Sequence, residues 1–307
     1  MSSAPQNPLV HALDKLTATL QSFLTDTVTL QAGQPLLSST CAFRWRRKKG
    51  LLNQATLEAV PNPLLLDFDA LQNIERQQKL IEDNTHQFVL GLPANNVLMT
   101  GARGTGKSSL VRACLAKFKD QGLRLIEVEK QHLEDLPDIV SLVRDLPYKF
   151  VVFCDDLSFD DGEHAYKGLK TVLDGSIMGP SANVLVYATS NRKHLISERM
   201  KDNLETSLNE FGEIHPGDTT EEKVSLSERF GLHLHFYSFT QPEYLRAVHH
   251  WLAHYGVTTG DNDQATQQLA IRWATQKGSR SGRVAMQFAR DLAGKTLLQQ
   301  HLSSEQN

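Results

Sequence analysis

The sequence predicts an α/β protein in which helices cover a parallel sheet and a smaller helical domain follows. Short apolar runs, typical of buried strands, alternate with segments whose apolar residues recur every three or four positions, as in helices. A glycine-rich loop directly joins one such strand to one such helix. After residue 240 the strand-like runs stop and only helical periodicity continues, which marks a domain boundary near Thr240.

The strands are expected at 97–100, 123–128, 150–154, 184–188 and 233–237. The run 150–154 is apolar throughout, which indicates burial on both faces of the sheet. Helices are expected at 70–88, directly after the glycine-rich loop, at 132–145 and at 163–174. This alternation of strands and helices is the pattern of a parallel sheet.

Both ends of the chain contain helical patterns. A helix is expected at 9–24, whereas 31–63 mixes glycines and prolines with charged residues. Beyond the sheet, helices are expected at 243–255, 263–276 and 281–300, the first opened by a capping box from Thr240 to Glu243. The expected division is a partly helical N-terminal region of unknown role (1–64), an α/β domain (65–240) and a helical domain (241–307).

The composition is that of an ordinary soluble globular protein. The chain has 307 residues, of which 40% are hydrophobic and 22% charged, and its net charge is −3, so no overall field favours nucleic acid or membrane. The 3 cysteines are far apart, which favours a reducing compartment, and Cys114 and Cys154 lie in apolar runs typical of buried positions. With no signal peptide and no apolar run long enough to cross a membrane, we expect a cytoplasmic protein.

The glycine-rich loop fits the phosphate-binding P-loop pattern G-x-x-x-x-G-K-[ST]. The residues expected to bind a nucleotide are Gly101, Ala102, Arg103, Gly104, Thr105, Gly106, Lys107, Ser108 and Ser109. The glycines let backbone N–H groups point at phosphate oxygens, and the following helix adds its positive dipole end. Lys107 would reach the β- and γ-phosphates, and Ser108 would ligate Mg²⁺. The alternative is a glycine turn that binds nothing; a chance match in so long a chain has a probability on the order of a percent, so nucleotide binding is favoured.

Polar side chains follow two of the predicted strands. Asp155 and Asp156 come directly after the strand 150–154, and Asn191 follows the strand 184–188. The carboxyl ends of parallel strands form the ligand edge of a sheet, where a P-loop protein needs an acid for Mg²⁺. We therefore expect Asp155 to hold the metal, Asp156 to orient or deprotonate the attacking water, and Asn191 to bind that water or the γ-phosphate. Aspartate and asparagine also start turns, which is the alternative.

A basic stretch contains Arg44, Arg46, Arg47, Lys48 and Lys49, interleaved with aromatic residues. Such a stretch is able to grip a nucleic-acid backbone while its rings stack on bases. A solvated charged loop is the simpler interpretation and is favoured. Histidines at 250 and 254 have a spacing that a metal could use, but no third ligand matches, so they are expected to be ordinary histidines.

Taken together, these motifs resemble those of the AAA+ ATPases. The segment Ser225–Leu232 looks like the box that carries the arginine finger in branch-migration motors and clamp loaders, and Ser279–Ala285 looks like the start of the sensor-2 helix. The run 68–109 and the segment Cys154–Phe159 are similar to a bacterial family of AAA+ proteins of unassigned function. The likeness covers about residues 65–255.

The resemblance implies a sheet of order 5-1-4-3-2, a helical lid, and ATP and Mg²⁺ as cofactors. It also assigns roles to single residues: Walker A to Lys107 and Ser108, Walker B to Asp155 and Asp156, sensor 1 to Asn191, the arginine finger to Arg229, and sensor 2 to Arg283, with Arg280 as its competitor. Arginine fingers act on the neighbouring subunit, so Arg229 implies a homo-oligomer in the form of a ring or open ring. Many members have glutamate where Asp156 stands, and the shorter acid implies slow turnover or a switch.

The leading hypothesis is an Mg²⁺-dependent AAA+ ATPase that remodels or loads a macromolecule. One rival is a P-loop kinase or phosphotransferase, which would need a pocket for a small acceptor. Another is a nucleotide-gated binding module with negligible turnover. The sequence names no partner, and the polar residues Lys130, Gln131 and His132 weaken the hypothesis of a protein-threading unfoldase.

Overall fold

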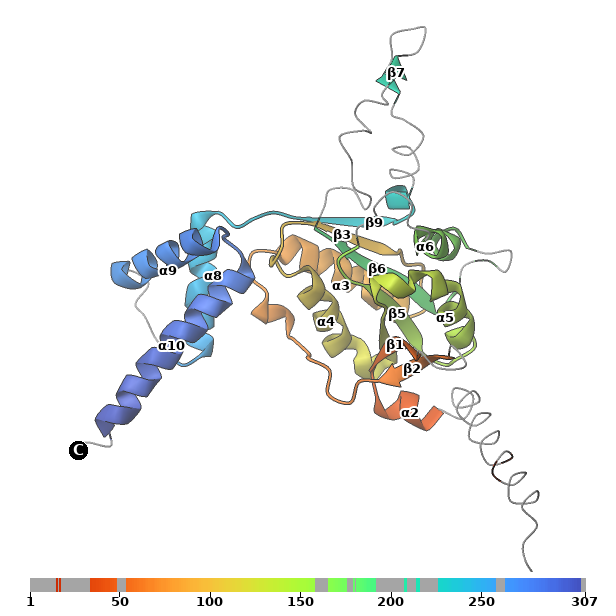
Figure 1. The fold of residues 1–307 in the computed structure, drawn as a ribbon, viewed down its shortest axis with the longest axis horizontal. Helices are drawn as coiled ribbons and strands as arrows, with labels where there is room; N and C mark the ends of the chain where they lie inside the picture. Colours follow the sequence, from red (N-terminus) through yellow and green to blue (C-terminus); the bar gives the residue numbers. More distant parts are fainter. Residues whose placement is uncertain are drawn as a thin grey trace, which may run out of the picture.

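The computed structural model describes residues 15, 17, 34–48, 54–157, 165–175, 179, 181–191, 207–208, 214–215, 226–257 and 263–304. Its centre is a seven-stranded sheet of order β2-β1-β4-β5-β6-β3-β9 (Figure 1). The strands are β1 (Ala42–Lys48), β2 (Gln54–Ala59), β3 (Val97–Gly101), β4 (Leu123–Glu127), β5 (Lys149–Cys154), β6 (Val184–Ser190) and β9 (Leu232–Phe236). A separate pair consists of β7 (Ser207–Leu208) and β8 (Ile214–His215). The helix expected at 9–24 lies almost wholly outside the described residues.

The expected strand order is confirmed. The strands β9-β3-β6-β5-β4 run parallel to one another, which is the order 5-1-4-3-2 when the predicted strands are numbered along the chain. β3 lies between β6 and the edge strand β9, with Thr100 opposite Ser190 of β6 on one side and His235 of β9 on the other. Since all of these strands point the same way, the loops after β3, β5 and β6 share one edge of the sheet.

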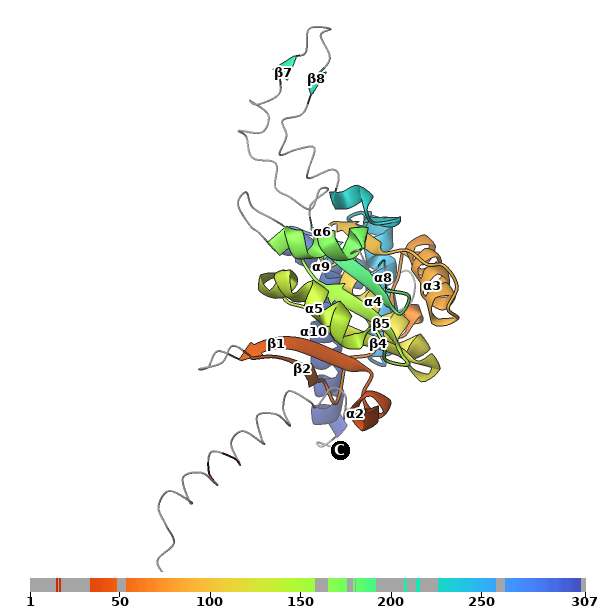
Figure 2. The same ribbon diagram turned by 90° about the vertical axis from the view of Figure 1, so that its right-hand side faces the viewer.

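Helices cover both faces of the sheet (Figures 1 and 2). One face packs against α3 (Glu75–Val89) and α4 (Lys107–Phe118), and the other against α5 (Leu136–Val143) and α6 (Ala165–Asp174). Side chains of β3 alternate between these layers, because Val97 and Met99 face α3 and α4 while Leu98 faces α5 and α6. Cys114 and Cys154 are buried as predicted, and burial raises the pKa of each thiol to about 12.

Two predicted helices begin later than expected. The helix expected from residue 70 begins at Glu75, because Asn73 adopts a left-handed backbone (φ 64°) that interrupts the periodic segment. The helix expected from residue 132 begins at Leu136, preceded by a short 3₁₀ segment, η3 (Lys130–Asp135), with a break at His132. Pro137 at the start of α5 explains this break, since its ring clashes with the preceding turn of a continuous helix.

The interpretation of the basic stretch as a solvated loop is wrong, because Arg44, Arg46, Arg47 and Lys48 lie in the sheet strand β1; Lys49 lies outside the described residues. β1 pairs in parallel with β4 and antiparallel with β2, and Figure 2 shows this pair at one border of the sheet, close to the short helix α2 (Gln34–Ser39). Phe43 and Trp45 are only 1% and 4% exposed, whereas the side chains of Arg44 and Arg46, at the alternate positions, are 38% and 46% exposed. This alternation is the period of a strand with one buried face. β1 and β2 precede residue 65 but belong to the same sheet.

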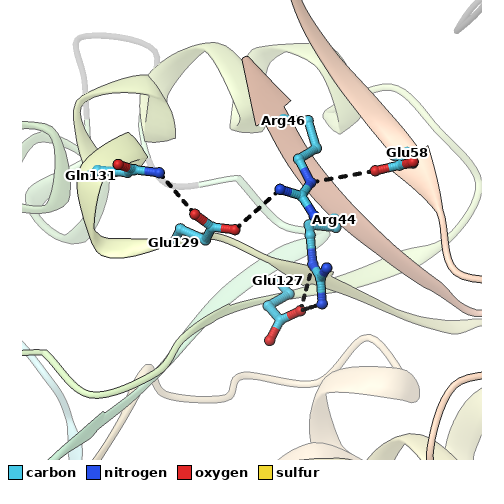
Figure 3. A network of polar contacts seen from close by, with 6 residues as sticks. All are labelled: Arg44, Arg46, Glu58, Glu127, Glu129 and Gln131. Carbon is cyan, nitrogen blue, oxygen red and sulfur yellow. Dashed lines mark hydrogen bonds and ion pairs between the residues drawn. The ribbon is translucent and has the colours of Figure 1, made fainter. Parts of the chain in front are cut away.

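Acidic side chains pair with the arginines of β1. Arg44 donates two hydrogen bonds, of 3.0 and 2.8 Å, to Glu127 at the end of β4 (Figure 3). Arg46 lies 3.5 Å from Glu58 and 3.6 Å from Glu129. These pairs place negative charge beside each cation, which weakens the field that a nucleic acid would meet on this strand.

A buried carboxylate fixes the outer end of β1 to η3. Asp135 accepts hydrogen bonds from the Trp45 indole (2.8 Å) and the Arg47 Nε (2.9 Å), and Arg47 also pairs with Glu134 at 3.1 Å. Since Asp135 is only 3% exposed, its charge depends on these donors for the solvation that water would otherwise provide. Arg47 therefore acts as a structural residue.

The C-terminal helices form a compartment with its own core. They are α8 (Gln241–His254), α9 (Gln264–Lys277) and α10 (Gly282–Ser304), and they lie beside the sheet in Figure 1. The predicted capping box is confirmed, because Glu243 accepts a hydrogen bond of 2.7 Å from the Thr240 amide. His250 and His254 pack edge-on against the Trp251 ring. In the described part of the chain, no helix is long and apolar enough to cross a membrane.

The packing of α6 against η3 gives a test of the fold. A Cβ atom at Gly168 would lie 2.3 Å from the Leu133 carbonyl oxygen, so Gly168→Ala should lower the free energy of unfolding by about 1–3 kcal/mol. Gly294 in α10 has nothing within 4 Å, and Gly294→Ala should raise it by about 0.4–1 kcal/mol. Urea denaturation measures both. Wild-type stability of Gly168→Ala would contradict the close contact.

The arginines of β1 give a second test. Arg47→Ala should lower the free energy of unfolding by about 1.5–3 kcal/mol, because it removes charged hydrogen bonds to a buried acid. Arg46→Ala should cost less than about 0.5 kcal/mol, because its ion pairs are exposed. Both variants should leave any DNA binding and its salt dependence unchanged in a filter-binding titration. A flatter salt dependence in Arg46→Ala would instead support a nucleic-acid role for β1.

Candidate functional site

The P-loop has the predicted context of strand, loop and helix. β3 ends at Gly101 and α4 begins at Lys107, and the glycines at 101, 104 and 106 all have positive φ angles. At Gly101 a Cβ atom would lie 1.9 Å from the Phe236 carbonyl oxygen of β9, so no other residue fits there. The loop is therefore held tightly between β9 and the start of α4.

The ammonium group of Lys107 lies inside this loop. Its Nζ donates to the carbonyls of Gly101 (2.8 Å) and Ala102 (2.7 Å) and to Oδ1 of Asn191 (3.1 Å), and the residue is only 6% exposed. Three acceptors match the three N–H groups of an ammonium. None of them carries a full negative charge.

Burial changes the titration of this lysine. Loss of solvation lowers the pKa of Lys107 to about 8, an effect that Arg103 and Arg283 reinforce and that Asp155 and Asp156 oppose. An additional anion beside Nζ would favour the charged form and raise this pKa. The site is therefore electrostatically suited to a negatively charged ligand.

The predicted carboxylates meet the P-loop at the same sheet edge. The Ser108 hydroxyl donates to Oδ1 of Asp155 at 2.7 Å, and Thr189 of β6 donates to the same oxygen at 2.5 Å. Thr189 also accepts a hydrogen bond of 2.9 Å from the Asp156 amide. One threonine thus orients both aspartates.

Asn191 closes the network. Its amide nitrogen donates to the Asp156 carboxylate while its Oδ1 accepts from Lys107. Asp156 has a φ angle of 53°, a conformation uncommon for residues other than glycine. Such backbone strain persists where the surrounding structure fixes it and often marks functional sites. Lys107, Ser108, Asp155, Asp156 and Asn191 are therefore brought together as expected, and Thr189 is the member that sequence reasoning missed.

The donor set at this edge fits Mg²⁺. The Ser108 hydroxyl and the Asp155 carboxylate lie within 2.7 Å of each other, and Mg²⁺ prefers hard oxygen ligands of this kind, together with phosphate oxygens and water. Within the described residues, no group of three or more histidine, cysteine, aspartate or glutamate side chains could hold a metal ion, so a site here would depend on the hydroxyl, on phosphate oxygens and on water as well.

The three C-terminal helices, α8 to α10, form the lid, and the start of α10 contacts the P-loop. The Arg283 amide donates to the Gly104 carbonyl at 3.1 Å, and a Cβ atom at Gly104 would lie 2.8 Å from the Ser281 hydroxyl. Arg283 is exposed and close enough to influence the pKa of Lys107. Arg280 is exposed as well, and its carbonyl accepts from the Phe239 amide at 3.0 Å. These contacts favour Arg283 over Arg280 as the guanidinium nearest to the phosphate site.

Arg229 lies at the opposite edge of the sheet. It precedes β9, whose first residue Leu232 pairs with Val97 at the start of β3, whereas the P-loop follows the end of β3. Its guanidinium pairs with Asp174, the last residue of α6. The structure does not bring Arg229 to the P-loop of its own chain.

Comparison with solved structures supports the AAA+ fold. The ORC1 protein of Aeropyrum pernix in complex with DNA aligns with a TM-score of 0.51 and 15% identity over 75% of this chain and 61% of that one. A mutant form of Thermotoga maritima RuvB aligns with a TM-score of 0.50 and 15% identity over 73% of this chain and 63% of that one. The chain thus spans about three fifths of the length of these proteins. At this identity the likeness establishes the fold alone.

Comparison by sequence identifies the family. No curated protein matches the chain. A family model matches residues 38–296, which include β1 and β2, the P-loop, both aspartates and most of the lid. This match covers far more than half of the chain, so the protein belongs to the family described as Protein of unknown function (DUF815).

Proposed function

We propose that this protein binds ATP with Mg²⁺ and hydrolyses its β–γ phosphoanhydride bond. The observation that best supports this proposal is a polar network at one edge of the sheet. In it, hydrogen bonds join each of the following residues to the next: Lys107, Asn191, Asp156, Thr189, Asp155 and Ser108. Phosphoryl transfer needs positioned charges more than covalent chemistry, and this network supplies them beside a P-loop.

The P-loop would bind the triphosphate. Its backbone N–H groups and the dipole of α4 attract phosphate oxygens, and the Lys107 ammonium would exchange its carbonyl partners for the β- and γ-phosphates. Arg283 would approach the γ-phosphate from the lid. Ser108 and Asp155 would hold Mg²⁺, which would neutralise charge on the phosphates.

Asp156 and Asn191 would act on the attacking water. The Asp156 carboxylate would accept a hydrogen bond from the water, and Asn191, which already contacts both Asp156 and Lys107, would fix its direction toward the γ-phosphate. The aspartate is one methylene shorter than the glutamate common in AAA+ proteins. This difference, and the hydrogen bond that holds Asp156 to Asn191, favour slow turnover, and a nucleotide-gated switch is therefore the second candidate.

Arg229 would complete the site of a neighbouring subunit in a homo-oligomer. Its distance from its own P-loop, at the other edge of the sheet, is the geometry that action in trans requires. A guanidinium that reaches the γ-phosphate stabilises the charge of the transition state. We propose that the lid transmits the nucleotide state to a macromolecular partner in the cytoplasm.

The titration of Lys107 predicts how ATP affinity depends on pH. With a pKa of about 8 in the free protein, Lys107 is charged below pH 8, and phosphates would raise its pKa in the complex. Affinity should therefore be constant below about pH 8 and fall up to tenfold per pH unit above it, with uptake of a proton on binding. Calorimetric titrations in buffers of different ionisation enthalpy measure both.

Lys107→Arg is the matched control, since a guanidinium stays charged over this range and should remove the dependence. Proton release, or affinity that rises above pH 8, would contradict the role of Lys107.

Action in trans can be tested with two inactive variants. Arg229→Ala should lower kcat about a thousandfold, and Lys107→Ala should abolish ATP binding. Mixed in equal amounts, they should recover about a quarter of wild-type ATPase activity, because one interface in four would pair an intact Lys107 with an intact Arg229. If the wild type is active and the mixture of the two variants shows no recovered ATPase activity, the role of Arg229 in trans is ruled out. A wild type that binds ATP without releasing phosphate would favour the switch.

A further inference from the structure

The segment 68–74, directly before α3, contacts both the P-loop and the lid. Within it, Leu71 and Ile74 approach the P-loop, since a Cβ atom at Gly106 would lie 3.2 Å from Ile74 Cδ1 and 3.9 Å from Leu71 Cδ2. The turn is fixed from α3 by Gln78, whose side-chain amide donates to the carbonyls of Phe68 (2.9 Å) and Leu71 (2.8 Å). Hydrogen bonds thus fix the conformation of this segment, and its apolar side chains pack against the P-loop.

Asn73 connects this segment to the lid. Its Nδ2 donates to the Glu243 carbonyl at 3.0 Å, and its Oδ1 accepts from the Arg246 guanidinium at 3.0 Å. Both partners lie in the first turns of α8. Since one side chain uses its donor and its acceptor on the same helix, the contact fixes position as well as distance.

The backbone of Asn73 supports a functional reason for this contact. Its φ angle is 64°, and within the described ranges only Asn73 and Asp156 combine a positive φ with a side chain. Asparagine tolerates this conformation better than most residues, but glycine adopts it more readily. The conformation therefore favours glycine, whereas the two contacts with α8 require an amide.

The lid consequently contacts the P-loop by two routes. The start of α10 does so directly, through the Arg283 amide and the Gly104 carbonyl, and α8 does so through Asn73. Between β9 and the lid only Tyr237 and Ser238 are exposed, since Phe239 already packs into the lid core and its amide donates to the Arg280 carbonyl, so a pivot of the lid would fall at 237–238. One contact would still allow the lid to rotate about this pivot. Two separated contacts, at Gly104 and at Asn73, fix its orientation.

We propose that Asn73 is a positioning residue that holds the lid over the P-loop and thereby sets the affinity for ATP. The inference rests on the proposed function, because it assumes that nucleotide binds at this loop. Apparent affinity scales with the fraction of protein in the competent conformation. Losing both hydrogen bonds should shift the lid equilibrium roughly tenfold or more.

The decisive variant is Asn73→Gly. Glycine accepts the left-handed backbone, so the turn is kept while both lid contacts are lost. We expect the Kd and the KM for ATP to rise about tenfold with kcat changed less than about twofold, and Arg246→Ala, which loses one contact, to raise both about threefold. Lys79→Ala, which removes an exposed ion pair with Asp83 on the same helix, is the control and should change neither.

Hydrogen exchange without nucleotide separates this inference from the proposed function. In Asn73→Gly the amides of 237–238 and of the first turns of α8 should exchange faster, while those of β3 and β6 stay protected. If the wild type fails to bind ATP, the proposed function fails, and exchange still reports whether Asn73 holds the lid. Unchanged exchange, or a lower melting temperature with unchanged Kd and KM, would overturn the positioning role.

Discussion

The buried ammonium group of Lys107 is the constraint on which the site depends. A charge removed from water needs partners, and here they are two loop carbonyls and the Asn191 side chain. These dipoles satisfy its hydrogen bonds but do not neutralise it, which is why its pKa falls to about 8. A polyanion would supply the missing charge. Only a ligand that enters the loop gains the free energy of that pairing. The burial of Lys107, which disfavours its charge in the free protein, therefore favours the binding of an anion.

The sheet explains why the necessary groups meet there. Helices bury both faces of the parallel strands, so polar side chains are tolerated mainly where the strands end. Three neighbouring strands deliver the P-loop, the aspartate pair and the alternating positions Thr189 and Asn191 to one edge. Thr189 is 2% exposed and bonds to both aspartates, so the geometry of the acids is set by the strand beside them. The site therefore depends on the order of the strands in the sheet. No single short motif predicts that order; only the motifs taken together do.

The sequence was sufficient for the features whose causes are local. The P-loop, the apolar strands and the capping box at Thr240 depend on residues a few positions apart, and all were predicted. β1 was missed because its stabilising partners are distant: Arg44 pairs with Glu127 and Trp45 with Asp135, and the charges obscured the alternation of Phe43 and Trp45. Thr189 was missed for a similar reason, since its role appears only when β6 lies next to β5. Asn73 and its partners Glu243 and Arg246, 170 and 173 positions away, are the extreme case.

These distant contacts also determine how a nucleotide site would communicate with the rest of the molecule. On the side of the sheet, β3, β9 and α4 hold the P-loop. The lid is joined to the P-loop by a hydrogen bond at Gly104 and to the neighbouring segment by the hydrogen bonds of Asn73. Polar contacts of this kind are individually weak, and the lid has a core of its own, so the lid would be able to change orientation while that core stays intact. Arg229, at the far edge beside Asp174, would add an intersubunit contact sensitive to the same ligand. Lid orientation and subunit contact would then both depend on the γ-phosphate, which would give the proposed ATPase a physical means of acting as a switch.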